Sequence, residues 1–312
     1  MTGQRRTAFT RPDALLVLVL LGVLFAVLLP ALLRARLQAR RDQSANNLKR
    51  LVLASVDYAD HHERQFLPPG CDDNGFSVVA KILPYLGEEA LYKRIDFSKP
   101  ISDPVNEAAR RTRLDFLLSP LDDQPLVAKD PTKALGPTNY LFSALSFPRH
   151  GVRRFPNSFT DGTSRTVFVV ETLRGNGNTT VSDVRRQHVA LAHAERGRLG
   201  TPYDFPKDLG VWEFKRNRNV AADRGTSWMD GGHLQGTFLP GRMPNDERPD
   251  VAVGPPRKVE GLSGPRSLDD VLNVGMGDGR VVHINPRTMT YDVWFTWLTP
   301  DGDDHGDDNG RW

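Results

Sequence analysis

The chain has 312 residues, a quarter of them charged, and a formal net charge of +3. This length allows one or two globular domains with a buried core. The charge is uneven, because residues 1–50 carry nine Lys and Arg against two acids, so the remainder has a net charge of −4. A slightly acidic body without a basic and aromatic patch argues against a nucleic-acid partner.

Residues 14–33 are all uncharged and rich in leucine. About 20 such residues at a rise of about 1.5 Å match the roughly 30 Å hydrocarbon core of a bilayer. We therefore predict one transmembrane helix near the N-terminus, with the membrane as a partner. Arginines flank it on both sides, so the positive-inside rule does not set its orientation.

A cleaved signal peptide is the alternative to a retained anchor. A signal has a shorter apolar core and a small-residue cleavage site, whereas Arg34 and Arg36 follow this stretch. The helical pattern also continues beyond the membrane edge to about residue 62, before Pro68. One stripe of an amphipathic helix is formed by Leu33, Leu37, Leu48, Leu51, Val52, Ser55 and Tyr58. These features favour an anchor.

The N-terminus resembles a type IV pilin or pseudopilin precursor. Phe9 follows Ala8, Asp13 lies four residues after Phe9, and Pro30 lies 21 residues after it. The resemblance implies that a prepilin peptidase cuts between Ala8 and Phe9 and that the new amine is methylated. The family usually has Gly at the position of Ala8, Glu at that of Asp13, and an apolar pair instead of Arg11-Pro12.

Residues along this helix have expected roles in assembly. Asp13 pairs with the amine of Phe9 on a neighbouring subunit, or alternatively caps the helix. Pro30 removes a backbone hydrogen bond and should kink or locally melt the helix. Gly22 and Ala26, four residues apart, permit close helix packing in lipid.

The sequence of the body predicts a series of short helices and strands. We predict one or two helices at 76–92 broken at Pro84, and a short strand at 114–118. Further strands are predicted at 138–145, at 166–171, where the Asp161-Gly162 turn precedes the strand, and between 210 and 241. Residues 244–267 read as a long loop, and 271–284 as a hairpin around Asp278-Gly279. The fold class is therefore α+β, a long N-terminal helix packed on a mostly antiparallel sheet.

Several blocks extend the resemblance to a planctomycete-type domain of unknown function found in pilin-like proteins. The matching blocks, in order along the chain, are residues 46–49, 66–70, 83–86, 161–166 and 278–279. Relatives usually carry cysteines where this chain has Ala45 and Ser119, and a His before the final hairpin that is absent here. If those cysteines form a bond in relatives, this chain lacks it.

Catalytic motifs are missing from the sequence, including nucleophile elbows, P-loops and Cys-rich metal sites. We predict a solvated helix end at His61, His62 and Glu63. We predict surface positions for His188 and His193. His233 is ambiguous. Cys71, the one cysteine, is expected to be buried. We therefore expect no enzyme activity and no required cofactor.

The tail, residues 301–312, carries five aspartates. Carboxylates at alternating positions around glycine suit calcium, with Asp301, Asp303 and Asp307 as candidate ligands. A late Glu ligand is missing, so a solvated acidic tail is the preferred interpretation.

The predicted organisation is a leader at 1–8, a pilin-like helix at 9–62, a body at 63–300 and the acidic tail. The resemblance implies a single-pass inner-membrane protein whose body lies in the periplasm or on the cell surface. It would assemble with other pilin-like subunits into a type IV pilus-like filament or a type II secretion pseudopilus. The alternative is a monomeric anchored module that binds carbohydrate or another surface ligand.

Overall fold

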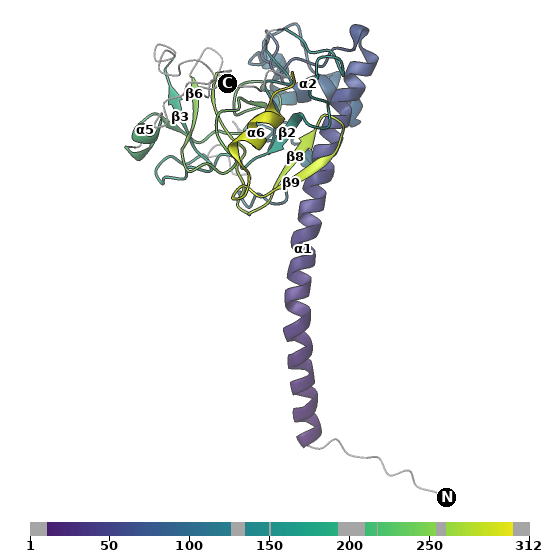
Figure 1. Ribbon diagram of the computed structural model, residues 1–312, viewed down its shortest axis with the longest axis vertical. Helices are drawn as coiled ribbons and strands as arrows, with labels where there is room; N and C mark the ends of the chain where they lie inside the picture. The colour runs from purple at the N-terminus through teal and green to yellow at the C-terminus, as the bar shows by residue number, and fades with distance from the viewer. Residues whose placement is uncertain are drawn as a thin grey trace, which may run out of the picture. The chain divides into compact units, whose positions relative to one another are not determined.

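The computed structural model describes residues 11–125, 135–149, 151–192, 210–216, 218–253 and 260–301. The chain divides into two compact units, Met1–Asp42 and Gln43–Trp312. One continuous helix, α1 (Arg11–His61), is the longest element (Figure 1). It ends where the sequence predicted, ahead of the Pro68-Pro69 pair.

The two parts of α1 differ in burial. In the first unit, Leu33 and Leu37 of the predicted amphipathic stripe are 63% and 37% exposed. In the second unit, Leu48, Leu51 and Val52 are completely buried. We call residues 43–61 the stem, since this part of the helix belongs to the core of the body.

Short helices follow the stem. They are η1 (Glu63–Gln65), α2 (Val78–Ile82), η2 (Leu83–Leu86), α3 (Glu89–Tyr92), η3 (Pro104–Asn106), α4 (Glu107–Arg110) and η4 (Asp115–Leu117). The hydroxyl of Ser77 caps α2 by accepting a hydrogen bond from the N–H of Ala80. Pro84 is the second residue of η2, which follows α2 and confirms the predicted break. The strand predicted at 114–118 is wrong, because a 3₁₀ turn occupies this segment.

The main sheet has five strands in the order β5-β1-β2-β8-β9. They are β1 (Tyr140–Ser143), β2 (Val167–Glu171), β5 (Thr237–Phe238), β8 (Leu272–Met276) and β9 (Val281–Ile284). All neighbours are antiparallel except β5 and β1. The strands predicted within 138–145 and 166–171 and the hairpin at 271–284 are confirmed.

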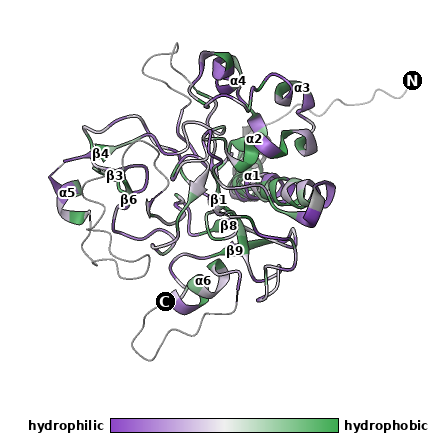
Figure 2. Cartoon of the chain, turned by 90° about the horizontal axis from the view of Figure 1, so that it is seen from above, coloured by the Kyte–Doolittle hydropathy of each residue, from purple (hydrophilic) through white to green (hydrophobic). Residues whose placement is uncertain are grey.

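Alternating side chains give this sheet two covered faces. Phe142 and Val169 pack into the core cluster that contains the stem, whereas Leu141 and Val170 pack with Trp294 of α6 (Tyr291–Leu298). Seen from above, the stem and α6 lie on opposite sides of β8 and β9 (Figure 2). The stem approaches β8 closely, because a Cβ added at Gly275 would lie 3.0 Å from Cγ2 of Val52.

A second sheet has four strands in the order β4-β3-β6-β7. They are β3 (His188–Leu191), β4 (Val220–Ala221), β6 (Asp250–Val253) and β7 (Gly261–Leu262), with α5 (Val211–Lys215) beside β3. The loop predicted at 244–267 is therefore wrong, since it contains β6 and β7. The strands predicted at 210–241 are only partly right, because α5 begins this segment. Both sheets together confirm the α+β class.

Candidate functional site

The first unit presents an apolar surface on α1. Leu18, Val23 and Val27 are 64%, 59% and 65% exposed, and the large apolar side chains described between Leu15 and Leu33 are all exposed. Leaving so many leucines and valines in water is unfavourable, at about 25 cal/mol per Å² of apolar surface. By length and composition this helix can cross a membrane, and a signal sequence meets the same criteria.

Of the residues predicted to act in processing and assembly, Ala8 and Phe9 lie outside the described part of the chain. Asp13 lies within α1, two residues after its first described residue, and so does not occupy the N-cap position. Its proposed pairing stays a prediction.

Three further residues predicted to shape the helix lie on α1. The helix continues through Pro30, so no break separates its two halves there, although Pro30 cannot donate to the carbonyl of Ala26. A Cβ added at Gly22 would meet no atom of this chain within 4 Å. Gly22 and Ala26 are thus open to an outside partner, whether lipid or another helix.

A buried polar network lies where the stem meets the sheet. The hydroxyl of Tyr140 lies 3.0 Å from Oγ of Ser44 and accepts a hydrogen bond from Nδ2 of Asn47 at 3.2 Å. Deeper in the sheet, the carboxylate of Glu171 accepts hydrogen bonds from Oγ of Ser119 and from Nδ2 of Asn273, the latter at 2.9 Å. Buried polar groups need such partners, so the network fixes the position of the stem on the sheet.

The same contacts bring together two positions that the sequence singled out. Nδ2 of Asn47 also donates to the carbonyl of Leu118 at 3.5 Å, next to Ser119. The chain near Ala45 therefore runs beside the chain near Ser119. In this protein, hydrogen bonds join the two segments.

Burial raises the pKa of Glu171 above its usual 4.5, although the hydrogen bonds from Ser119 and Asn273 favour the ionised form. Between the ordinary and the raised pKa, the unfolded chain has lost this proton and the folded chain has kept it. The free energy of unfolding therefore falls as pH rises through this window.

Replacing Glu171 with Gln should remove that dependence. We expect the variant to gain stability relative to the wild type as pH rises above 4.5 and to show no such gain at lower pH. Urea denaturation of both proteins from pH 4 to pH 8 measures the difference. Glu107→Gln removes a carboxylate that is 47% exposed and serves as the control for the substitution itself. A flat difference for Glu171→Gln would contradict the raised pKa.

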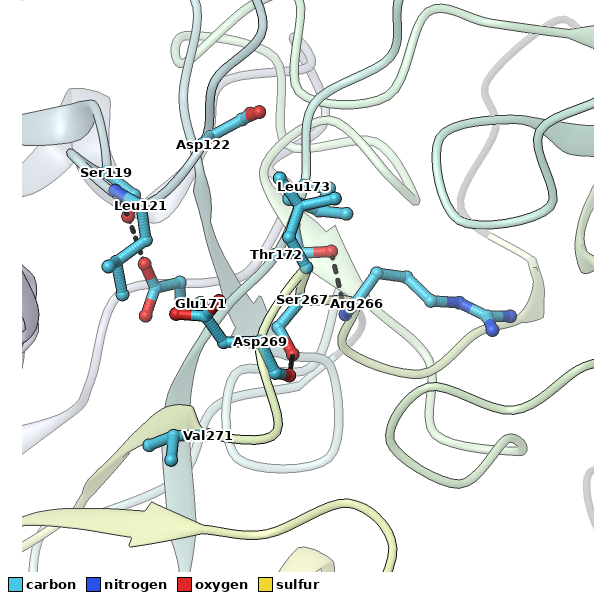
Figure 3. A pocket seen from close by; sticks show the side chains of 11 residues that line it. Ser119, Leu121, Asp122, Glu171, Thr172, Leu173, Arg266, Ser267, Asp269 and Val271 are labelled. Carbon is cyan, nitrogen blue, oxygen red and sulfur yellow. Dashed lines mark hydrogen bonds between the residues drawn. The ribbon is translucent and has the colours of Figure 1, made fainter. Parts of the chain in front are cut away.

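A small hollow beside this network contains a second carboxylate, that of Asp122 (Figure 3). The carboxylates of Asp122 and Glu171 point in different directions. Asp122 is held by Arg174 at 3.2 Å and by Arg186 at 2.7 Å, and it also accepts a hydrogen bond from Asn139. Both carboxylates thus have hydrogen-bonding or ionic partners within the body.

A charged cluster joins the second sheet to the first. Asp250 of β6 is completely buried, and its two carboxylate oxygens bind Arg224 and Arg266. Arg266 contacts the two residues that follow β2, since its backbone N–H donates to the hydroxyl of Thr172 and its carbonyl accepts from the N–H of Leu173. Burial alone would raise the pKa of Asp250, but the two guanidinium groups outweigh it and hold that pKa below its usual 3.8.

The histidines are placed differently from the prediction. His188 is only 1% exposed, so its assignment to the surface is wrong, and its Nε2 lies 3.5 Å from a carboxylate oxygen of Asp223. His233 is also buried, and burial lowers its pKa to about 3, so it is neutral at physiological pH. His193 lies outside the described residues. Nδ1 of His233 accepts a hydrogen bond from the N–H of Leu239 at 3.2 Å.

No cluster of metal-ligating side chains occurs among the residues that the structure describes. Of the calcium candidates, Asp301 lies 3.3 Å from Nη1 of Arg153, and Asp303 and Asp307 lie outside the described residues. Exposed His61 and His62 each direct Nδ1 to a backbone carbonyl of their own helix. Cys71 is buried, as expected.

Comparison with known proteins gives one match. A family model described as a protein of unknown function (DUF1559) matches residues 34–288. The chain belongs to this family. No curated protein and no solved structure matches it.

The DUF1559 match begins directly after the apolar residues 14–33 and covers the stem and most of the body. The resemblance to a domain of unknown function is therefore confirmed. The pilin resemblance rests on residues before the match and stays a prediction. Sequence reasoning missed the buried network and the Asp250 cluster, because isolated Ser, Asn, Asp and Arg residues form no recognisable motif.

Proposed function

We propose that this DUF1559 protein is a membrane-anchored, non-enzymatic, pilin-like subunit. The observation that carries the proposal is the continuity of α1: exposed apolar side chains cover its first half, and the same helix continues as the buried stem. An apolar helical segment of this length can serve as the lipid anchor of the folded body. The body would lie outside the cytoplasm, in the periplasm or on the cell surface.

Assembly would use the first half of the helix. In the proposed filament or secretion pseudopilus, the apolar surfaces of neighbouring helices pack together once the chain has been cut before Phe9. Open space at Gly22 would allow close approach of a second helix. Asp13 would pair with the free amine of Phe9 on the next subunit, since a carboxylate near lipid is costly without a cation.

Processing tests the proposal directly. Co-expression with a prepilin peptidase should give a mature chain that begins at Phe9, as read by N-terminal sequencing. In detergent, the mature wild type should crosslink into a ladder of oligomers, and Asp13→Ala should remove at least nine tenths of it. Asp57→Ala, at a carboxylate in the stem, serves as the control and should leave the ladder unchanged. An uncut monomer would contradict assembly.

A specific observation also favours the alternative, an anchored binding module. Trp212 of α5 is 51% exposed, and the guanidinium of Arg216 lies 4.2 Å from the centroid of its ring. Exposed tryptophan rings beside arginines suit anionic sugars, which stack on one face and pair with the cation. Loss of binding to an acidic glycan array on Trp212→Ala, together with an uncut N-terminus, would support this function over assembly.

A further inference from the structure

An open hollow of about 410 Å³ lies between one flank of the stem and the hairpin β8–β9. The stem contributes Ala45, Asn46, Lys49 and Leu53, and the hairpin contributes residues 278–283. Two blocks that the sequence analysis singled out, at 46–49 and 278–279, therefore meet in space. A Cβ added at Gly279 would lie 3.0 Å from Cδ2 of Leu53, so the hairpin turn rests against the stem at one end of the hollow.

The strand along this hollow, β9, is an edge strand of the main sheet, with β8 as its neighbour on one side. The N–H of Met276 donates to the carbonyl of Arg280, which fixes the register. Hydrogen-bonded and non-hydrogen-bonded residue pairs alternate in an antiparallel ladder. The backbone N–H and C=O groups of Val282 and Ile284 therefore point to β8. The N–H and C=O groups of Val281 and His283 therefore point to the open edge. Among the described residues, none bonds to these backbone groups.

One side chain beside this edge, that of Lys49, gives it positive charge. Lys49 is exposed and has no carboxylate partner in the described part of the chain. Arg280 is paired with Asp278 at 2.8 Å, so these two charges cancel. His283 is exposed, and its Nδ1 lies 2.6 Å from Oδ1 of Asn273. The ammonium group of Lys49 is the one uncompensated full charge among the residues that line the hollow.

We propose that this groove binds an extended peptide segment that carries acidic side chains and adds to the sheet beside β9. An extended backbone can replace water at the outward groups of both Val281 and His283 and pair with them as a further strand. Alternate side chains of an added strand point to the same face. Those on the stem side would approach Lys49, where a carboxylate is favoured, and the half-exposed Leu53 would cover the neighbouring apolar carbon atoms.

The probe is a fluorescein-labelled peptide, acetyl-Val-Glu-Val-Glu-Val-amide, added to the full chain in detergent micelles. We expect saturable binding by fluorescence anisotropy. The matched peptide with Lys in place of Glu should bind at least tenfold more weakly. A Glu peptide that is N-methylated at alternate amides should not bind, because it cannot pair with a strand edge. Equal binding of all three peptides would overturn the proposal.

Two variants locate the binding. Lys49→Glu should reverse the preference between the Glu and Lys peptides, whereas Lys99→Glu, at an exposed lysine outside the hollow, should leave it unchanged. Val281→Pro should reduce binding of the Glu peptide at least tenfold, since it removes an outward N–H from an edge strand that tolerates proline. Val281→Ala keeps that N–H and should bind as the wild type does.

A different occupant would give a different pattern. If no peptide binds and Val281→Pro instead dissociates oligomers of the wild type, the edge pairs with a second copy and the peptide proposal is wrong. Peptide binding is independent of cleavage before Phe9. Failure of this proposal is therefore distinguishable from failure of the proposed assembly.

Discussion

Replacing Asp250 with Asn should lower the free energy of unfolding by about 3–5 kcal/mol, because it leaves Arg224 and Arg266 buried without a full counter-charge. The free energy of unfolding of a domain is about 5–15 kcal/mol, so this loss is a large fraction of the total. Urea titration followed by tryptophan fluorescence measures it, since Trp228 and Trp294 are completely buried.

The pH dependence and a control make this prediction specific. The pKa of Asp250 is held below 3.8. The loss of unfolding free energy in Asp250→Asn should therefore be complete above pH 3.8 and should shrink as pH falls through the lowered pKa. Asp115→Asn breaks an ion pair whose carboxylate is 83% exposed, and should not change stability measurably. Equal stability of Asp250→Asn and the wild type at pH 7 would show that the cluster is not a structural element.

Placing two lysines in the apolar half of α1 should remove the protein from membranes. Leu24 and Leu28 are both 51% exposed and lie one turn apart. Each Leu→Lys change near the middle of a membrane span costs about 3–4 kcal/mol on insertion scales. The double variant Leu24→Lys/Leu28→Lys should therefore be found almost entirely outside the membrane fraction of fractionated cells.

Matched variants separate charge from helix damage. The double change to Ala at the same positions keeps helix propensity and should stay in the membrane fraction. Val181→Lys adds a charge at a body residue that is 65% exposed, and should also stay there. Retention of the double lysine variant in membranes would mean that residues other than 14–33 attach this protein to lipid.

The sequence predicted the elements whose signals are local. The apolar run, the Pro68-Pro69 stop after the stem, the Pro84 break and the Asp278-Gly279 turn each depend on neighbouring residues, and the structure has the corresponding elements. Strands β1 and β2 were found because their residues are apolar and flanked by turn signals.

Elements that depend on distant partners were not predicted. Strand β6 lies among prolines and becomes a strand by pairing with β3, about 60 residues earlier. The segment 114–118 has apolar residues typical of a strand, but Leu117 packs into the core from a single turn. His188 was assigned to the surface because its spacing from His193 does not place the two on one helix face. Its burial follows instead from pairing with Ala221 and Asp250 in the second sheet, which residues distant in the sequence determine. The carboxylate network likewise joins residues up to 102 positions apart.

The most direct test is the intact mass of the protein recovered from membranes washed with alkaline carbonate. We predict that it stays in the washed membranes and that its mass includes residues 14–33, starting at Phe9 where prepilin peptidase is present and upstream of Phe9 where it is absent. A protein released by the wash, with a mass that begins after Leu33, would show a cleaved signal and would contradict the membrane anchor.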